Sequence, residues 1–415
     1  MKAGLGKDRA AAGLVPAALL TASVVAVLLI ALLGPTACSG KAPAPAPATT
    51  APVSTGPPVV AHGLTAADAR ASLGRFDRAF SAPAPGGRFY RLDTSGGFAD
   101  FWKAAEMIET VEDYYDYTGK AAYKAEVATL CNGFVARYGT DWMKKYSLKP
   151  GHRYLGHRAN DDVMWMIIAS ARAYRITGDV RYRAMARTNF DRAWARAWSA
   201  DMGGGLWWRS AHDRPQKNAT TNAPAVIAAC ELSRALGDKA YLAKAERLYA
   251  WIRAKLYDPQ TGQVYDHLSW TTAPNVKVYP TPYTYNQGTF IGAADRLVLL
   301  TGVRSYAVDA RRALAYTRTH LTRRGILQSD GGLANQDTGG FKGIFARWAV
   351  RFTRDQHIVA FDPWFRRNAG AAWARRNARG LIGQDWTIPT GNGLQYSWDC
   401  SAAVAMLETL LPKGR

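Results

Sequence analysis

Two adjacent carboxylates are the clearest candidates for chemistry in this chain. Asp161 and Asp162 follow Asn160 and precede the apolar run Val163–Ala169. Adjacent Cα atoms lie about 3.8 Å apart, so the two carboxyl groups can sit about 5 Å apart, as in a retaining rather than an inverting glycosidase. Close carboxylates resist joint ionisation, so the pKa of one should rise and let that group act as an acid. A helix N-terminus would favour the ionised partner as a nucleophile.

The same residues also suit a purely structural role. Asn is a good N-cap, and Asp in the first turn opposes the helix dipole. Against this reading, the helix that starts at Val163 is apolar all round, which predicts a buried helix whose N-terminus is not plain surface. Two aspartates in a row also exceed what capping requires. We therefore interpret Asp161 and Asp162 as a catalytic pair.

A repeat of helical segments must position this pair. Gly119, Gly178, Gly237 and Gly302 each close an apolar, Ala-rich segment and open another that contains a Tyr. The spacings are 59, 59 and 65 residues, which indicates stacked units that bury their faces against one another. Glycine suits the left-handed residue that ends a helix.

The periodicity predicts two sets of six helices. The first set is expected at 99–117, 160–176, 220–236, 286–300, 341–352 and 397–411. Its companions are expected at 65–80, 120–138, 180–198, 239–257, 304–321 and 361–379. Strand-like alternation is almost absent. We predict an all-α (α/α)6 toroid with six inner and six outer helices. The alternative, an open superhelix of the tetratricopeptide kind, has a shorter period and fewer aromatics.

The residues just before the first set of helices suggest a binding site. If the two sets alternate, all six N-termini of the first set open on one end of the toroid. Aromatic, amide, glycine and acidic residues would then converge there, from Gly96–Phe98, Asn160–Asp162, Lys217–Asn222, Tyr285–Gln287, Gly339–Lys342 and Tyr396–Asp399. An aromatic pocket with a few polar groups is the usual form of a ligand site, and aromatic faces suit sugar rings.

The N-terminal segment predicts export. Basic residues precede the strongly apolar run Leu14–Leu33, as in a signal sequence or a membrane anchor over residues 1–40. Residues 36–40 resemble a lipoprotein cleavage site with Cys38 as the lipidated residue, although Pro35 departs from the usual pattern. Lipoprotein, uncleaved anchor and secretion all remain open. A Pro/Ala/Thr-rich linker follows over 41–60, and the catalytic domain is expected over 61–415, outside the membrane.

Composition excludes several other classes. The net charge is +21, but the basic residues are scattered along helices without a nucleic-acid motif, so we expect no nucleic-acid partner. The charge is a weak indication of anionic surroundings. Cys131, Cys230 and Cys400 form an odd set in apolar context, which predicts buried free thiols. The seven histidines lack metal-ligand spacing, so we predict neither a metal nor a cofactor.

Five motifs in order resemble glycoside hydrolase family 76, the α-1,6-mannanases. They are Asn160–Asp179, Gly203–Arg209, Lys217–Pro224, Tyr283–Gly288 and Gly339–Phe345, and the similarity runs from about Phe98 to Leu411. The resemblance implies an (α/α)6 fold and endo-acting hydrolysis of α-1,6-mannoside bonds with retention. It implies Asp161 as the nucleophile and Asp162 as the general acid/base.

The resemblance also implies a set of sugar-binding residues. We expect the groove to be lined from Trp207, Trp208, Asn222, Tyr285, Asn286, Phe341 and Lys342, together with Trp398 at the start of the last inner helix. Asn222 could instead cap its helix, and Phe341 could belong to the core. The segments His152–Arg158 and Gln328–Thr338 are candidates for determining tolerance of branches or phosphates.

Three rival functions follow from the same residues. A cell-wall glycan transglycosidase of the same family would keep both aspartates and form products longer than its substrate. A sugar epimerase on the same toroid would need histidine bases, and an unsaturated uronyl hydrolase would also rely on different residues. A non-catalytic mannan-binding lipoprotein would need Trp207 and Trp208 but not the carboxylates. The expected partners are a mannose-containing glycan and, through the N-terminal lipid or helix, a membrane; we expect a monomer.

Overall fold

The computed structural model describes residues 63–142, 159–209, 215–331 and 337–412. The chain divides into two units, Met1–Pro58 and Val59–Arg415, and every described residue belongs to the second. The predicted signal segment, Cys38, the linker 41–60 and the whole of His152–Arg158 lie outside the described residues. No helix within the described ranges combines the length and the apolar character needed to cross a bilayer.

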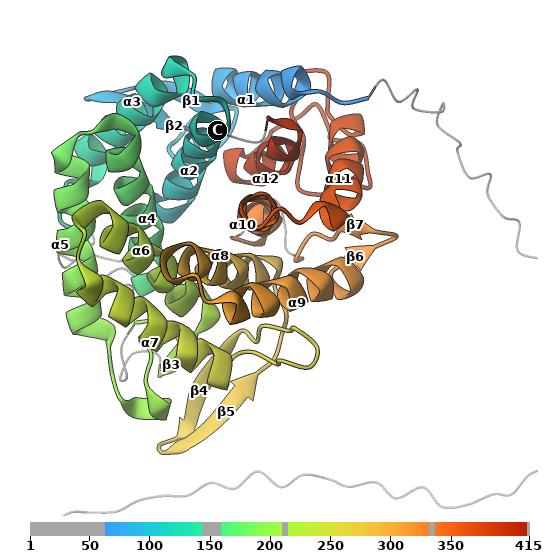
Figure 1. Cartoon of the computed structure of the whole chain (residues 1–415). Helices are drawn as coiled ribbons and strands as arrows, with labels where there is room; N and C mark the ends of the chain where they lie inside the picture. The colour runs from blue at the N-terminus through green and yellow to red at the C-terminus, as the bar shows by residue number, and fades with distance from the viewer. Residues whose placement is uncertain (1–62, 143–158, 210–214, 332–336, 413–415) are drawn as a thin grey trace, which may run out of the picture. The chain divides into compact units, whose positions relative to one another are not determined.

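The described part of the second unit contains twelve α-helices arranged as an inner and an outer ring (Figure 1). The inner helices are α2 (Phe101–Thr118), α4 (Asn160–Thr177), α6 (Ala219–Leu236), α8 (Thr284–Thr301), α10 (Phe341–Asp355) and α12 (Ser397–Leu407). The outer helices are α1 (Ala66–Phe80), α3 (Ala121–Tyr138), α5 (Val180–Ala197), α7 (Lys239–Lys255), α9 (Arg304–His320) and α11 (Asp362–Ala374). The predicted all-α toroid is confirmed.

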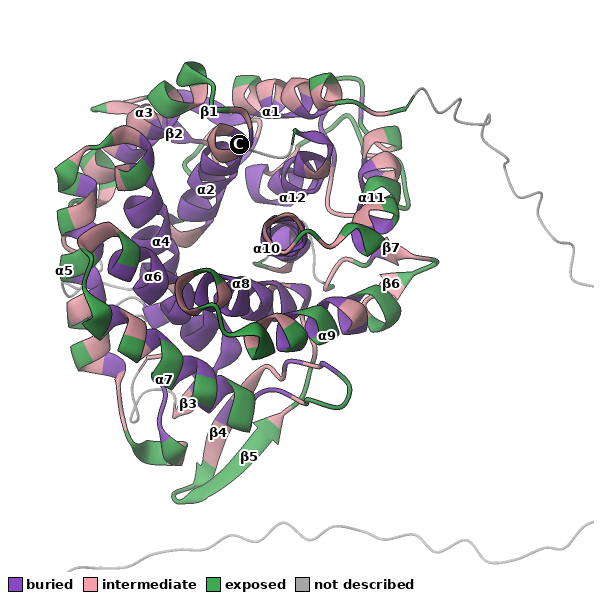
Figure 2. Cartoon of the chain, in the orientation of Figure 1, coloured by how far each residue is buried: buried purple, intermediate pink, exposed green. Residues whose placement is uncertain are grey.

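Burial separates the two rings. The inner helices are buried almost all round, whereas the outer helices bury one face and expose the other (Figure 2). Each inner helix packs against the next, and α12 closes the ring by packing against α2. This arrangement explains the sequence pattern, because a helix covered on all sides needs apolar or paired polar residues on every face, whereas an outer helix needs only an apolar stripe.

Short strands and 3-10 turns fill the connections. Antiparallel pairs form between β1 (Ser81–Ala84) and β2 (Gly87–Tyr90), and between β6 (Thr322–Arg323) and β7 (Ile326–Leu327). A three-stranded sheet has the order β3 (Gln216–Asn218), β4 (His267–Thr272) and β5 (Asn275–Tyr279). The 3-10 turns are η1 (Asp201–Gly203), η2 (Asp337–Gly340), η3 (Val359–Phe361) and η4 (Glu408–Leu410).

The helices end near the predicted positions with two exceptions. All four turn glycines adopt left-handed conformations directly after α2, α4, α6 and α8, as predicted. The helix expected over 361–379 ends at Ala374, because the Asn377 side chain accepts hydrogen bonds from the backbone N–H groups of Arg379 and Leu381 and turns the chain. The last helix ends at Leu407 and continues as η4.

The ring interior holds a buried ionic cluster below the helix N-termini. Asp113 of α2 accepts hydrogen bonds from Arg172 of α4 at 2.6 Å and from Arg347 of α10 at 2.7 Å. Burial alone would raise the pKa of Asp113, but the surrounding arginines lower it. Burial raises the pKa of Glu109, in the same cluster, to about 8. These contacts tie three inner helices together.

The prediction of buried free thiols is confirmed for the three cysteines among the described residues. Cys131, Cys230 and Cys400 are buried and free. Burial raises the pKa of each thiol, so none is prepared to act as a nucleophile.

Candidate active site

The N-terminus of α4 is fastened to the segment that carries two tryptophans. The Asn160 side-chain amide donates to the carbonyl of Trp207 at 2.8 Å, and the Asn160 backbone N–H donates to the carbonyl of Trp208 at 2.8 Å. The Asn160 side-chain oxygen accepts from Arg196 of α5 at 3.0 Å. Asn160 is not the N-cap of α4, which is Ala159; its side chain instead fastens the start of the helix to the segment that carries Trp207 and Trp208.

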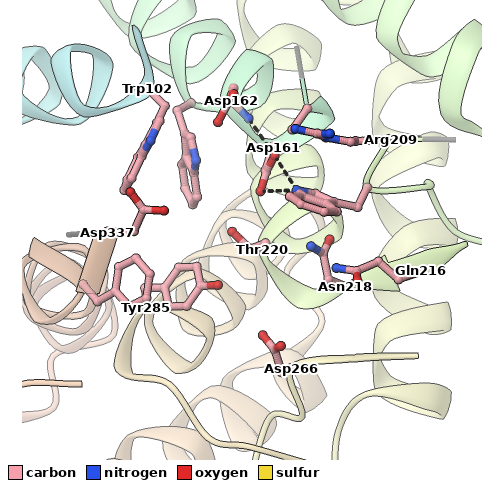
Figure 3. A pocket seen from close by; sticks show the side chains of 14 residues that line it. Trp102, Asp161, Asp162, Arg209, Gln216, Asn218, Thr220, Asp266, Tyr285 and Asp337 are labelled. Atoms are coloured by element: carbon pink, nitrogen blue, oxygen red, sulfur yellow. Dashed lines mark hydrogen bonds between the residues drawn. The ribbon is translucent and has the colours of Figure 1, made fainter. Parts of the chain in front are cut away.

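Asp161 is held in a defined orientation. The Trp208 indole N–H lies 3.0 Å from each carboxyl oxygen of Asp161, and the Asp162 backbone N–H donates to Oδ1 at 3.0 Å (Figure 3). Burial raises the pKa of Asp161 to about 6, while these hydrogen bonds act to lower it. A rise in one pKa of the pair was predicted, but its main cause is burial rather than the neighbouring carboxylate.

A third carboxylate faces the cavity from the three-stranded sheet. Asp266 immediately precedes β4, which pairs with β3 so that His267 lies opposite Asn218. The Asn286 side-chain amide donates to Asp266 Oδ1 at 3.0 Å, and His267 Nδ1 lies 2.7 Å from Oδ2. Asp266 is thus oriented from both sides, and Figure 3 shows it across the cavity from Asp161.

Aromatic side chains supply flat walls. Tyr285 of α8 stacks on Phe341 of α10 with ring centroids 3.8 Å apart. Trp102 of α2 and Trp165 of α4 also line the cavity. Together with the carboxylates they enclose a cavity of about 350 Å³ at the N-terminal ends of the inner helices, which we call the aspartate cavity. Residues at or next to the N-termini of five of the six inner helices line this cavity, and α12 contributes none, so the predicted convergence is confirmed in part. The cavity combines apolar faces with acidic groups.

Five of the ten predicted site residues line the aspartate cavity. They are Asp161, Asp162, Trp208, Tyr285 and Phe341. The first two come from one helix N-terminus, and the others from the adjoining loop and two further inner helices.

The other five predicted residues lie one layer behind the cavity. Asn222 is fully buried, accepts from Leu206 N–H at 2.7 Å and donates to the carbonyls of Leu206 and Asn218. Asn286 orients Asp266, as described above. Trp207 packs under Trp270 and Lys217, Lys342 faces the Trp386 ring at 4.1 Å, and Trp398 packs edge-on against Trp102 at 4.8 Å.

Sequence reasoning missed several lining residues. Asp266 lies in a connection outside the predicted helices, and no local pattern marks it. Asp337 lies in Gln328–Thr338, which was predicted only as a segment that determines tolerance of branches or phosphates. Trp165 carried a usable signal, because it lies four residues after Asp161 and so shares its helix face. Trp102 lies one residue inside α2 and could have been found from its position at a helix N-terminus. Arg209, Gln216, Asn218 and Thr220 also line the cavity.

Comparison with known proteins identifies the family. Glycosyl hydrolase family 76 matches residues 70–413, which is most of the chain. The chain belongs to glycosyl hydrolase family 76. The family resemblance noted in the sequence is confirmed.

Individual members of family 76 support the match. The α-1,6-mannanase GH76A of Salegentibacter sp. HEL1_6 is 26% identical, with a TM-score of 0.72 over 83% of this chain and 98% of that enzyme. An inactive variant of that enzyme, with two consecutive aspartates replaced by alanine, was solved in complex with α-1,6-mannotetrose. Mannan endo-1,6-alpha-mannosidase DFG5 of Saccharomyces cerevisiae is 25% identical over 312 residues, covering 69% of this chain and 66% of the relative. The chain thus spans about two thirds of the length of that curated relative.

Proposed function

We propose that this protein hydrolyses α-1,6-mannosidic linkages within a mannan-type polysaccharide or glycolipid, with retention of configuration. Asp161 is the nucleophile and Asp162 the general acid/base. The observation that carries the proposal is the Asp161–Asp162 pair, the only Asp-Asp sequence in the chain, at the wall of an aromatic cavity. The family 76 relatives support it: one is an α-1,6-mannanase whose variant at two consecutive aspartates is inactive.

The assignment of roles follows the family and agrees with the electrostatics of Asp161. A raised pKa alone would favour Asp161 as the acid. A pKa of about 6, however, leaves most of this carboxyl group ionised at neutral pH, as a nucleophile requires. The Trp208 indole and the Asp162 backbone N–H hold the carboxylate in place. This pre-orientation lowers the entropy lost in reaching the transition state.

In the proposed reaction, an oxygen of Asp161 attacks the anomeric carbon while Asp162 gives its proton to the departing glycosidic oxygen. A covalent glycosyl-enzyme forms, and the first sugar chain leaves as an alcohol. Asp162, now ionised, takes a proton from water, and the resulting attack on the anomeric carbon releases Asp161. Asp266 and the Tyr285–Phe341 stack are placed to bind the sugar: the carboxylate accepts from hydroxyl groups, and the rings pack on C–H faces.

We place the activity outside the membrane, at the cell surface or in the secreted fraction. The support is the basic start followed by the apolar run Leu14–Leu33 and a Pro/Ala/Thr-rich spacer. Cys38 is the proposed lipidation site. We propose that the protein acts as a monomer.

The linkage assay tests the proposed function. The purified full chain, in mild detergent, is incubated with linear α-1,6-mannan and with α-1,2- and α-1,3-linked controls, and oligosaccharide release is followed. We expect release from the α-1,6 polymer alone, with the α-anomer formed first in proton NMR spectra. Products longer than the substrate would instead identify a transglycosidase. Binding without release would identify a non-catalytic mannan-binding protein.

The pH dependence of the reaction should report on Asp161. Because the nucleophile must be ionised, kcat/KM should fall as the pH drops through about 6. Trp208→Phe removes a hydrogen bond that lowers the pKa of Asp161, so the acid limb should move up by about one pH unit. The measurement is the pH profile of kcat/KM for both proteins.

A matched tryptophan variant controls for general effects. Trp194→Phe changes an outer-ring residue that stacks on Trp198, away from the cavity, and should leave the acid limb in place. An acid limb that does not move in Trp208→Phe would show that Asp161 does not set it.

A further inference from the structure

A second hollow lies directly behind the wall of the aspartate cavity. It measures about 370 Å³ and is formed by the loop between α11 and α12, the first turn of α12 and residues 329–331. We call it the second hollow. Trp398 separates the two spaces: its indole packs against Trp102 of the aspartate cavity and donates to the carbonyl of Asp337 at 2.8 Å. The next residue, Asp399, lines the second hollow.

The turn η2 forms the rest of this wall. Gly339 lies so close to the Asp399 carboxyl group that a Cβ would come within 2.0 Å of Oδ1, and Gly340 is equally close to the Trp398 ring. Asp337, at the start of the same turn, lines the aspartate cavity. One layer of residues therefore divides two spaces that open at the same end of the toroid. A single extended molecule can reach both.

The lining of the second hollow suits a carbohydrate. Polar side chains reach it from Gln384, Asp385 and Gln395. Two aliphatic side chains stand beside them in water, with Ile388 58% and Leu394 50% exposed. A pyranose ring presents the matching surfaces, with hydroxyl groups at its edge and C–H groups on its face, and sites for such ligands combine a few polar groups with apolar area.

The charged side chains that line the second hollow favour a neutral ligand over an anionic one. None of the described lining residues is Lys or Arg, although the whole chain has 53 of them and a net charge of +21. The nearby Lys342 is buried against Trp386, and burial lowers its pKa to about 7. The Asp385 carboxyl group, whose pKa burial would raise but hydrogen bonds from Thr387 lower below its ordinary value, would repel a phosphate or an acidic sugar. Within the described residues there is also no group of three His, Cys, Asp or Glu residues that could hold a metal ion.

We propose that the second hollow binds a neutral mannose residue of the same polysaccharide whose scissile bond lies in the aspartate cavity. This inference rests on the proposed function and adds a specificity site to it. The bound residue comes either from a side branch or from a distant part of the backbone. Both sources present the same pyranose chemistry. The site makes the enzyme favour polymers over short oligosaccharides.

Gly391→Trp tests this inference by filling the second hollow. Gly391 lines the hollow, is exposed, and a Cβ there meets no atom within 4 Å, so a tryptophan side chain fits at the hollow without displacing the fold. Gly370→Trp is the matched control, because Gly370 lies on outer helix α11 and is equally open. Kinetics of the full-length proteins are measured on linear α-1,6-mannan, on α-1,2-branched mannan and on α-1,6-mannotetraose.

We expect Gly391→Trp to lower the ratio of kcat/KM on polymer to kcat/KM on tetrasaccharide about tenfold, mainly through KM; Gly370→Trp should not change this ratio. A loss on branched mannan alone identifies a side branch, and a loss on both polymers identifies a backbone residue. Ratios within about twofold of the unmodified protein on both polymers overturn the inference. If the unmodified protein cleaves no substrate, the proposed function fails, and equal binding of branched mannan by both variants would then overturn the second hollow as a mannose site.

Discussion

Asp161→Asn is expected to lower kcat on α-1,6-mannan at least about a thousandfold, because it replaces the attacking carboxylate with a group that cannot form the glycosyl ester. Asp162→Asn should cause a loss of similar size on the polysaccharide, whose sugar leaving group needs a proton. Both losses are measured as initial rates of reducing-end formation. Either variant retaining more than about a tenth of the activity would remove that residue from the mechanism.

The two aspartates can be told apart with an activated substrate. A dinitrophenyl glycoside of α-1,6-mannobiose has a leaving group that departs without a proton. Asp162→Asn should therefore release dinitrophenol in a burst, whereas Asp161→Asn should release none. The reverse pattern would exchange the proposed roles.

Folding is a separate control for these variants. Burial raises the folded-state pKa of Asp161 from its ordinary 3.8 to about 6, so ionisation of this group opposes folding as the pH rises through that interval. At pH 7 the neutral amide of Asp161→Asn should leave Tm equal or higher. Loss of activity together with a lower Tm would point to misfolding instead of missing chemistry.

The sequence predicted the helices well because their ends and their burial leave signals in the local sequence. Left-handed glycines end four inner helices at the predicted turns, and inner helices such as α4 and α6 are mostly apolar because the ring covers them. The end of the helix at Ala374 was harder to predict. The side chain of Asn377 accepts hydrogen bonds from backbone N–H groups after this point, and helix propensity does not include such side-chain competition.

The sequence predicted those site residues that lie at the start of inner helices, but not those that lie in the connections. Asp161 and Tyr285 were found because each lies in the first turn of an inner helix. Asp266 was not found, because its position is fixed by the pairing of β3 with β4. The paired residues Asn218 and His267 are far apart in sequence. Motif membership also did not separate lining residues from supporting ones: Asn286 belongs to a motif but acts on Asp266.

The buried ionic cluster was invisible for a related reason. Along the sequence, α2 reads as an amphipathic helix with several acidic residues, which would ordinarily face solvent. Its partners Arg172 and Arg347 come from α4 and α10, and only the closed ring brings them to Asp113. Ion-pair partners from different helices are brought together only by the tertiary fold, so the spacing of residues along one helix does not identify them.

Loss of one of these arginines should have the largest effect on stability. Arg347 is buried and donates to Asp113 at 2.7 Å, to the Thr110 hydroxyl at 3.0 Å and to the Glu106 carboxyl group. Arg347→Met leaves Asp113 and Glu106 with too little positive charge in a site closed to water. Breaking a buried pair in this way costs about 3–5 kcal/mol, which corresponds to a Tm lower by roughly 4–7 °C for a domain of this size.

The pH dependence and a matched variant make this prediction specific. Burial raises the pKa of Glu106. Without Arg347 the carboxyl groups should take up protons more readily, so the loss of Tm should be smaller at pH 5 than at pH 7.5. Arg175→Met removes a partly exposed partner of Asp116, 2.8 Å away, and should cost less than about 1 kcal/mol. Equal effects of the two variants, or a Tm loss in Arg347→Met that grows at low pH, would show that the cluster does not hold the ring together.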